Sequence, residues 1–405
     1  MKFLVYKNGK LNKDFALAGA YLFGTDSVPL RSGQNISVKD GVIECQGKSN
    51  ETIGLSLLWS TDTFGRIELS TTRLIDREEP YILNLELARA KLMQIMLKRE
   101  EWAFFDENDK IAVFAHQAQD HFIEALKCIS NPAKASVLAD RALRKALIFS
   151  ERLAARNAEF YLSTRCKNRG LGRHSLGCVI DPDLMVSEKY RKRLFEMFCY
   201  MTIPVSWAQI EPVKGEYDFS EIDRVLKYFA GRRLAVCVGP LLCFSKEDLP
   251  KWLLEEKPKF ETIRESAYKF VSAVVGRYVG KVHAWNIISG INAINLFGFN
   301  AEQVVEITRS ACLAAKTADT RSKSRKIVEV VNPWGEYYAS DKDTIPPLVY
   351  ADMVIQNGIP NDDFAVRMRF GIDDPCCMVR DMMQISSRLD NFSSLGRTLH
   401  ITGVA

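Results

Sequence analysis

A short segment of the chain, residues 331–338, gathers the side chains best suited to bind a ligand and react with it. It reads Val-Asn-Pro-Trp-Gly-Glu-Tyr-Tyr. Trp334 or Tyr337 could stack on a ring of the ligand, Asn332 could donate a hydrogen bond, and Glu336 could act as an acid or base. The alternative is that Pro-Trp-Gly forms a packed turn and that Glu336 is a solvated residue at the start of a helix. The sequence leaves both interpretations open.

Two arginines form a second candidate site. Arg367 and Arg369 alternate with apolar residues, so on a β-strand both point to the same side. A buried guanidinium group needs a carboxylate or an anionic ligand. We expect a pair with Glu336 or Asp373, and the alternative is an acidic sugar or a phosphate ligand.

Metal and thiol chemistry find little support in the sequence. His116 and His121 have no cysteine or carboxylate at ligand spacing, so we expect surface histidines and no metal or cofactor. Cys376 and Cys377 are adjacent and have no Cys-x-x-Cys spacing or clear base beside them. The ten cysteines show no disulfide framework and the N-terminus has no signal-peptide pattern, so a cytoplasmic protein with free thiols is expected.

Composition limits the kind of partner. The chain has 405 residues, of which 47% are apolar and 26% charged, which is typical of a globular protein with two domains. Its net charge is +5, and its basic residues are scattered, so nucleic acid is an unsuitable partner. No apolar run is long enough for a membrane span. The partners that remain possible are a small ligand, an oligosaccharide or another protein.

Residues 1–165 are expected to form a β-rich domain with helical segments between 83 and 163. The signals are short apolar runs broken by turn residues, followed by apolar residues at helical spacing. This domain could be an accessory or carbohydrate-binding module. The expected strands and helices cover residues 18–24, 40–45, 52–59, 65–70, 83–98 and 132–163.

Residues 175–405 alternate short apolar strands with amphipathic helices, which predicts an α/β fold of the (β/α)8 barrel type. Only seven of the eight strands are found. Either the sequence is a fragment of a longer chain or the barrel is open, and we favour a fragment. The expected strands cover 175–180, 201–206, 233–239, 281–288, 326–331, 365–370 and 398–402, and the expected helices cover 220–229, 260–278, 302–315, 347–356 and 379–392.

The segment Trp207–Phe219, which reads Trp-Ala-Gln-Ile-Glu-Pro-Val-Lys-Gly-Glu-Tyr-Asp-Phe, resembles the segment after the second strand of glycoside hydrolase family 10, the xylanase family. The resemblance extends over residues 175–405 and includes Leu-Pro-Lys-Trp at 249–252 and Ile-Thr at 401–402. It implies a barrel that hydrolyses β-1,4-xylan or a related β-glycan, in which Trp207 takes part in substrate binding.

The same resemblance indicates that the catalytic groups are missing. A retaining glycosidase uses two carboxyl groups about 5 Å apart. The family's acid/base aligns with Gly290 and its nucleophile with Gly403. Polar sugar-binding motifs of the family align with the apolar residues of 203–206 and 239–244. We therefore expect no retaining xylanase activity.

Three hypotheses remain. The first is a catalytically inactive family 10 relative that binds a glycan at the ends of its strands. The second is an active hydrolase whose site has been rebuilt around Glu336. The third is a scaffold that binds a protein partner.

Overall fold

The structure is a computed structural model, and it describes all residues except 18, 26–28, 31–34, 47–50, 103–109, 169, 171, 173–174, 257, 332–333, 335–343, 372–377 and 404–405. The chain forms two compact units. The first holds Met1–Arg165, Trp334–Lys342 and Arg369–Asp390, and the second holds Cys166–Pro333, Asp343–Met368 and Asn391–Ala405. Two segments that the sequence analysis assigned to the barrel are thus grouped with the N-terminal residues.

The first unit contains short strands that pair mostly antiparallel. One sheet has the order β5-β6-β1-β9, a second has the order β4-β7-β8, and β2 pairs with β3. The expected strands near residues 21, 43, 57 and 67 are all present. Their bounds are β1 Lys2–Leu4, β2 Tyr6–Lys7, β3 Lys10–Leu11, β4 Tyr21–Phe23, β5 Asn35–Lys39, β6 Val42–Gln46, β7 Gly54–Thr61, β8 Gly65–Ser70 and β9 Tyr81–Ile82.

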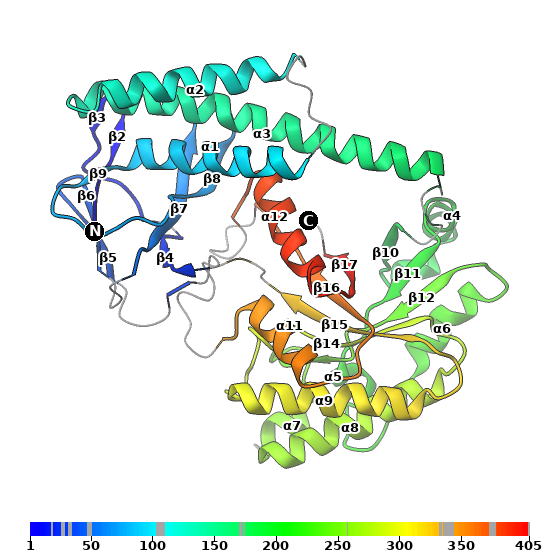
Figure 1. The fold of residues 1–405 in the computed structure, drawn as a ribbon. Coiled ribbons are helices and arrows are strands. Elements are labelled where there is room, and N and C mark those ends of the chain that lie inside the picture. The colour runs from blue at the N-terminus through cyan, green and yellow to red at the C-terminus, as the bar shows by residue number, and fades with distance from the viewer. Residues whose placement is uncertain are drawn as a thin grey trace. The chain divides into compact units, whose positions relative to one another are not determined.

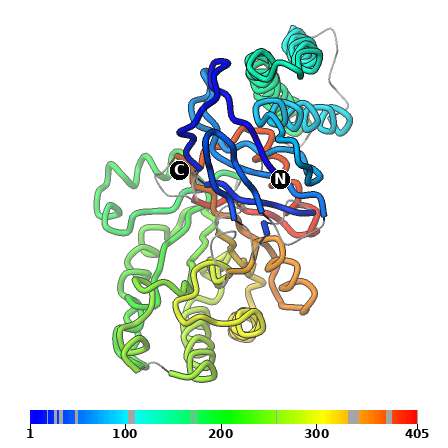
Figure 2. The backbone as a smooth tube through the Cα atoms, turned by 90° about the vertical axis from the view of Figure 1, so that its left-hand side faces the viewer, coloured from blue at the N-terminus to red at the C-terminus, as the bar shows by residue number. Residues whose placement is uncertain are grey.

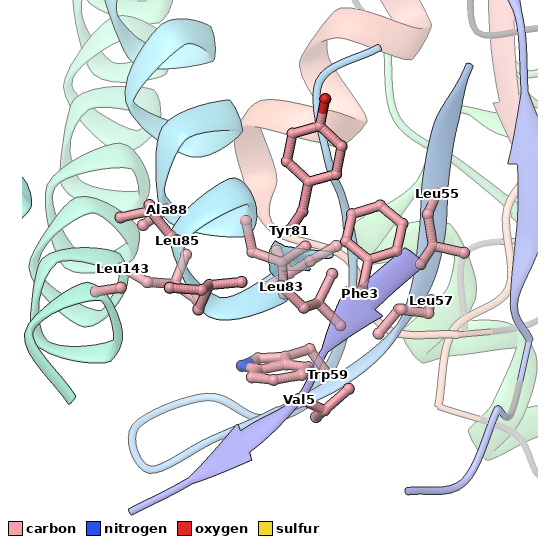
Figure 3. Close-up of a cluster of buried hydrophobic side chains, with 14 of the residues drawn as sticks. Phe3, Val5, Leu55, Leu57, Trp59, Tyr81, Leu83, Leu85, Ala88 and Leu143 are labelled. Carbon is pink, nitrogen blue, oxygen red and sulfur yellow. The ribbon is translucent and has the colours of Figure 1, made fainter. Parts of the chain in front are cut away.

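Three helices lie side by side in this unit: α1 Leu83–Glu101, α2 Ala112–Lys127 and α3 Pro132–Asn168 (Figures 1 and 2). Figure 3 shows how the core joins strands to helices, with Phe3 and Trp59 facing Leu83 and Leu85. All four side chains are at most 7% exposed. Burying one such side chain stabilises the fold by roughly 1.5–3 kcal/mol. This cluster draws side chains from both strands and helices, and a second cluster around Phe149 packs among the helices.

The second unit is built on a curled parallel sheet with the order β10-β11-β12-β14-β15-β16-β17. The short strand β13 also pairs with β14. The predicted seven parallel strands and the barrel-type α/β fold are confirmed. The strands are β10 Gly177–Val179, β11 Tyr200–Ile203, β12 Ala235–Val238, β13 Leu242–Cys243, β14 Ala284–Ser289, β15 Arg325–Val331, β16 Asp363–Arg367 and β17 Thr398–Thr402.

Helices connect these strands, as the alternating pattern predicted. Helices α8 and α9 pack against each other, and α9 also contacts β14 and β15. Asn300 and Gln303 form a reciprocal capping box that fixes the start of α9. The helices are α4 Glu188–Met197, α5 Trp207–Ile210, α6 Ser220–Phe229, α7 Lys251–Glu256, α8 Phe260–Arg277, α9 Ala301–Ala318 and α11 Pro347–Gln356. Helix α12, Met382–Ser393, follows β16 in the chain but belongs to the first unit as far as Asp390.

Two boundaries differ from the prediction for local reasons. Strand β16 ends at Arg367, so Arg369 lies outside it and the shared face predicted for the two arginines does not form. Helix α12 begins at Met382 rather than near residue 379. The Asp381 carboxylate accepts the backbone N–H groups of Met383 and Gln384, both at 3.1 Å, and so caps the helix there.

Candidate functional site

Buried polar residues interrupt the apolar strands of the second unit where these strands end. Strands β14, β15 and β16 are buried almost throughout, as expected for parallel strands covered on both faces. Glu329 is nevertheless 2% exposed, Asn286 6% and Ser289 0%. Carboxyl ends of parallel strands are where barrel enzymes place their sites, so these residues form the candidate site.

Glu329 is the centre of this group. Its Oε2 accepts hydrogen bonds from Arg367 Nη2 at 2.8 Å and from Asn286 Nδ2 at 3.1 Å. Its Oε1 accepts a hydrogen bond from the Thr402 hydroxyl. Arg367 Nη2 also donates to the Ser289 hydroxyl at 3.1 Å. We call Glu329, Arg367, Asn286, Ser289 and Thr402 the Glu329 cluster; together they tie the ends of β14, β15, β16 and β17.

The cluster leaves hydrogen-bonding capacity on two of its members. Within the described part of the chain, Arg367 bonds through Nη2 only, although a guanidinium also carries donors on Nε and Nη1. The Oδ1 atom of Asn286 is buried and has no partner among the described residues. The Arg367 side chain is 26% exposed. Among the described residues, donors of Arg367 and an acceptor of Asn286 are therefore unpaired, and the Arg367 side chain is partly exposed.

Gly403 lies directly beside the stem of Arg367. Its φ is +57°, and a Cβ added there would lie 2.9 Å from Arg367 Cγ and 3.4 Å from Cδ. Real Cβ atoms keep a greater distance from aliphatic carbons, because packed carbons are about 3.5–4.0 Å apart. The Arg367 side chain thus takes the space in which a larger residue at 403 would begin.

Gly290 follows the last residue of β14 and turns the chain. Its φ is +69°, and an added Cβ would meet Val331 at 3.0 Å and Ile294 at 3.3 Å. Its N–H donates to the Glu329 carbonyl at 2.9 Å. A left-handed backbone conformation favours glycine over a residue with a side chain, so this turn does not readily present a carboxylate.

A second polar group, at the opposite ends of the strands, is anchored by Asp363. Its carboxylate bonds to Arg325 and to His400, whose Nε2 lies 3.2 Å from Oδ2. Burial tends to raise the pKa of Asp363, but the hydrogen bonds from Arg325 and His400 outweigh it and lower the pKa to about 2. Residues at the amino ends of barrel strands usually serve stability, and this is the role we assign to the Asp363 group.

Burial also keeps the thiols of this sheet protonated. It raises the pKa of Cys237 to about 11 and that of Cys243 to about 12. Thiolates are the reactive form of cysteine, so neither residue is suited to nucleophilic chemistry. The described cysteines form no disulfide bond with one another, and Cys376 and Cys377 lie outside the described residues.

Trp207 packs in the core. It is 0% exposed and stacks on Phe270. Its Nε1 donates to Glu211 Oε2 at 2.6 Å. The substrate-binding role predicted for Trp207 therefore has no free ring face or N–H group to support it.

The structure describes only one of the four candidates in segment 331–338. Asn332, Glu336 and Tyr337 lie outside the described residues. Trp334 is 4% exposed and belongs to the first unit, where Phe370 and Arg380 contact its ring. Arg369, the remaining candidate, is exposed.

The described residues offer no metal site at the two histidines and no helix that could span a membrane. His116 and His121 lie on α2, and the described residues hold no group of three or more His, Cys, Asp or Glu side chains arranged to bind a metal ion. Among the helices that the structure describes, none is both long enough and apolar enough to cross a bilayer.

Sequence reasoning missed Glu329, Asn286 and Ser289. The available signal was an acidic residue within the apolar run Ile327–Val331. A charge inside a strand buried on both faces needs a partner. Each hydrogen bond of the cluster joins residues that are 38 to 78 positions apart in the sequence, so the partners could be identified only from the fold.

Comparisons with known proteins show which family the chain resembles. A family model described as Glycosyl hydrolase family 10 matches residues 166–404. Endo-1,4-beta-xylanase 2 of Claviceps purpurea is 30% identical over 81 residues, which are 20% of this chain and 24% of that protein. The chain therefore spans about a quarter of the curated relative that it matches.

Solved structures of xylanases are also similar. Native xylanase 10B from Thermotoga maritima has a TM-score of 0.43 at 18% identity, over 56% of this chain and 68% of that one. Xylanase 10B from Thermotoga petrophila RKU-1, in complex with xylobiose, has a TM-score of 0.42 at 17% identity, over 55% and 67%.

Proposed function

Because the chain belongs to glycosyl hydrolase family 10, we propose that its second unit binds a carbohydrate at the carboxyl ends of its strands and does not carry out retaining hydrolysis. The proposal combines the family's ligand class with the residues found in this chain. For a cytoplasmic protein, the ligand would be a short oligosaccharide rather than polymeric xylan.

The observation that carries the proposal is the position of Arg367 beside Gly403. A retaining glycosidase needs a nucleophilic carboxylate and an acid/base carboxyl group, and its transition state resembles a cation. Here both aligned positions are glycine, and Arg367 Cγ lies 2.9 Å from the Cβ site of residue 403. A guanidinium group at this place would destabilise developing positive charge, so it opposes the family reaction.

Glu329 does not supply the missing nucleophile. Its two oxygens already accept hydrogen bonds from Arg367, Asn286 and Thr402. A nucleophile must also reach the ligand, whereas the Glu329 side chain is only 2% exposed. We therefore assign Glu329 to positioning Arg367.

Apolar residues also replace the polar binding motifs of the family. Ile203, Leu241 and Phe244 are each 0% exposed and act as core. Without polar groups that tighten on the transition state, binding energy cannot be converted into rate. Carbohydrate binding without turnover is the outcome that these residues favour.

Hydrolysis of aryl β-xylosides and β-glucosides, measured beside calorimetric titration with xylo-oligosaccharides, tests the proposal. The intact protein and Glu336→Gln should both bind and neither should turn over substrate. Turnover that is lost in Glu336→Gln would establish the rebuilt hydrolase instead. Absence of both turnover and binding would exclude a xylo-oligosaccharide ligand and favour a protein partner.

A further inference from the structure

We propose that Arg367 is a ligand-binding residue, and that the ligand of this site carries a carboxylate or phosphate group on a hydroxylated ring. The inference rests on the proposed carbohydrate-binding function and specifies the chemistry of the ligand. An oligosaccharide bearing a uronic acid and a sugar phosphate share this chemistry.

The first support is the reversal of charge at the site. Both positions that align with carboxylates are glycine, and the side chain nearest to position 403 is a guanidinium group. Arg367 Nε lies 3.9 Å from the place of a Cβ at 403. A ligand at this place would thus meet guanidinium N–H donors instead of a carboxylate acceptor, and the complementary ligand group is an anion.

The second support is the orientation of the guanidinium. Nη2 is fixed by Glu329 at 2.8 Å and by Ser289 at 3.1 Å. Because a guanidinium is planar and rigid, fixing Nη2 also fixes Nε and Nη1. These groups have no partner in the described part of the chain, and the side chain is 26% exposed. A preoriented donor loses little entropy when it binds an anion.

Glu329 pairs with Nη2 of Arg367 and, among the described residues, leaves the Nε and Nη1 donors available to a ligand. Its carboxylate balances the charge of Arg367, and its oxygens are occupied by hydrogen bonds from Arg367, Asn286 and Thr402. It is also almost completely buried, whereas the arginine reaches solvent. The buried partner therefore holds the guanidinium in place, and the partly exposed edge of Arg367 faces the ligand.

The third support is the unsatisfied acceptor of Asn286. Its Oδ1 has no partner among the described residues, although the residue is only 6% exposed. Asn286 and Arg367 donate to the same oxygen, Glu329 Oε2, so their polar groups lie near each other. Leaving a buried polar atom unpaired is unfavourable, and a ligand hydroxyl would satisfy it. An anionic group for Arg367 and a hydroxyl for Asn286 together define an acidic sugar or a sugar phosphate.

Calorimetric titration of the intact protein tests this assignment with four probes: a neutral xylo-oligosaccharide, one of equal length bearing glucuronic acid, xylose 1-phosphate and inorganic phosphate. We expect at least one of the two anionic sugars to bind about tenfold more tightly than the neutral one, which corresponds to one well-placed charged contact. A preference for the uronic acid or for the sugar phosphate identifies the source of the anion.

Substitutions test whether Arg367 causes the preference for anionic sugars. Arg367→Gln should abolish the tenfold preference, and Arg367→Lys should retain part of it as a point charge. Because Arg367→Gln leaves Glu329 without its cation, the double variant Arg367→Gln/Glu329→Gln serves as a second version with no unpaired charge. Arg264→Gln is the matched control, since Arg264 forms a similar pair with Glu306 at 3.1 Å on helices of the same unit.

The possible outcomes distinguish the anion-binding role of Arg367 from the proposed carbohydrate binding. Equal binding of neutral and acidic sugars overturns the role of Arg367 and leaves carbohydrate binding intact. Binding of inorganic phosphate as tightly as xylose 1-phosphate overturns the carbohydrate part and retains the anion site. An anion preference that persists in the double variant assigns it to another residue, and absence of binding by all four probes overturns both proposals.

Discussion

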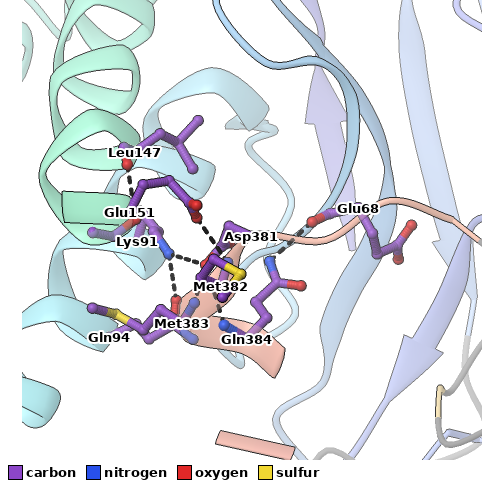
Figure 4. A network of polar contacts seen from close by, with 10 residues as sticks. Glu68, Lys91, Gln94, Leu147, Glu151, Asp381, Met382, Met383 and Gln384 are labelled. Atoms are coloured by element: carbon purple, nitrogen blue, oxygen red, sulfur yellow. Dashed lines mark hydrogen bonds and ion pairs between the residues drawn. The ribbon is translucent and has the colours of Figure 1, made fainter. Parts of the chain in front are cut away.

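Lys91 and Asp381 form an ion pair of 2.7 Å between side chains that are each 2% exposed, although 290 residues separate them in the sequence. Figure 4 shows the surrounding contacts: Glu151 accepts the Met382 N–H at 2.7 Å, and Gln384 donates to the Glu68 carbonyl at 2.9 Å. These contacts fasten the segment after β16 into the first unit.

Asp381→Asn should destabilise the protein by about 3–5 kcal/mol, because breaking a buried ion pair leaves one charge uncompensated. The variant also weakens the cap of α12. Urea unfolding measures the change. Lys91→Met combined with Asp381→Asn should be more stable than Asp381→Asn alone, since no buried charge remains.

Glu256→Gln is the control for this experiment. Glu256 pairs with Lys214 at 2.8 Å, and both side chains are about half exposed, so its loss should change stability little. Equal effects of Asp381→Asn and Glu256→Gln would contradict the importance given to the buried pair.

Restoring carboxylates with Gly290→Glu and Gly403→Glu should not produce xylanase activity. Both positions have positive φ, and residue 403 would collide with Arg367. The apolar residues that replaced the binding motifs would also remain. Release of nitrophenol from an aryl β-xyloside measures the rate, and appreciable hydrolysis by the double variant would show that the binding shell is intact.

Alanine substitutions separate the collision from backbone strain. Gly396 has a φ of +70° and no atom within 4 Å of an added Cβ, whereas Gly403 has a φ of +57° and Arg367 in contact. Gly403→Ala should therefore lower the melting temperature more than Gly396→Ala. The reverse order would mean that Arg367 moves aside at little cost.

Asp140→Asn should stabilise the protein at neutral pH by about 2 kcal/mol. Burial raises the pKa of Asp140 to about 6, against a hydrogen bond from Asn84 that lowers it. A raised pKa means that the stabilising contribution of the protonated form is complete below pH 3.8 and is lost as the pH rises through about 6. Unfolding free energies at pH 4.5 and 7.5 should show the gain mainly at 7.5, and a gain that is equal at both pH values would contradict this cause.

Asp363→Asn should have the opposite pH dependence. Arg325 and His400 hold the pKa of Asp363 at about 2 despite its burial, so its stabilising contribution is present above pH 3.8 and is lost as the pH falls through about 2. The variant should be less stable by about 2 kcal/mol at pH 7, and the difference should shrink below pH 4. Asp183→Asn, at a side chain that is 92% exposed, is the control, and thermal unfolding between pH 2.5 and 7 supplies the measurement.

The sequence predicted the second unit well because its signals are local. Apolar runs such as Ile327–Val331 identified the buried strands, and the segment beginning at Trp207 identified the family. The same segment misled the site assignment, because Glu211, four residues after Trp207, accepts the indole N–H. The Trp-x-x-x-Glu spacing gave no sign of whether the ring faces a ligand or the core.

The remaining features depend on contacts between distant residues. Strands β1 and β9, of three and two residues, are too short to show a period of two, and they form because β1 pairs with both β6 and β9. The Glu329 cluster draws on four strands. Assignment of Arg369–Asp390 to the first unit depends on partners such as Lys91, which no local pattern reveals.

The first unit is assembled from segments that are far apart in the sequence, and this affects how it folds during translation. A ribosome adds about 5–20 residues per second, and N-terminal domains generally fold first. Lys91 emerges 290 residues before Asp381, so it waits about 15–60 seconds at that rate for its carboxylate. Throughout that interval the nascent first unit lacks the carboxylate that pairs with Lys91 in the folded protein, and the unit can finish folding only after Asp381 has been synthesised.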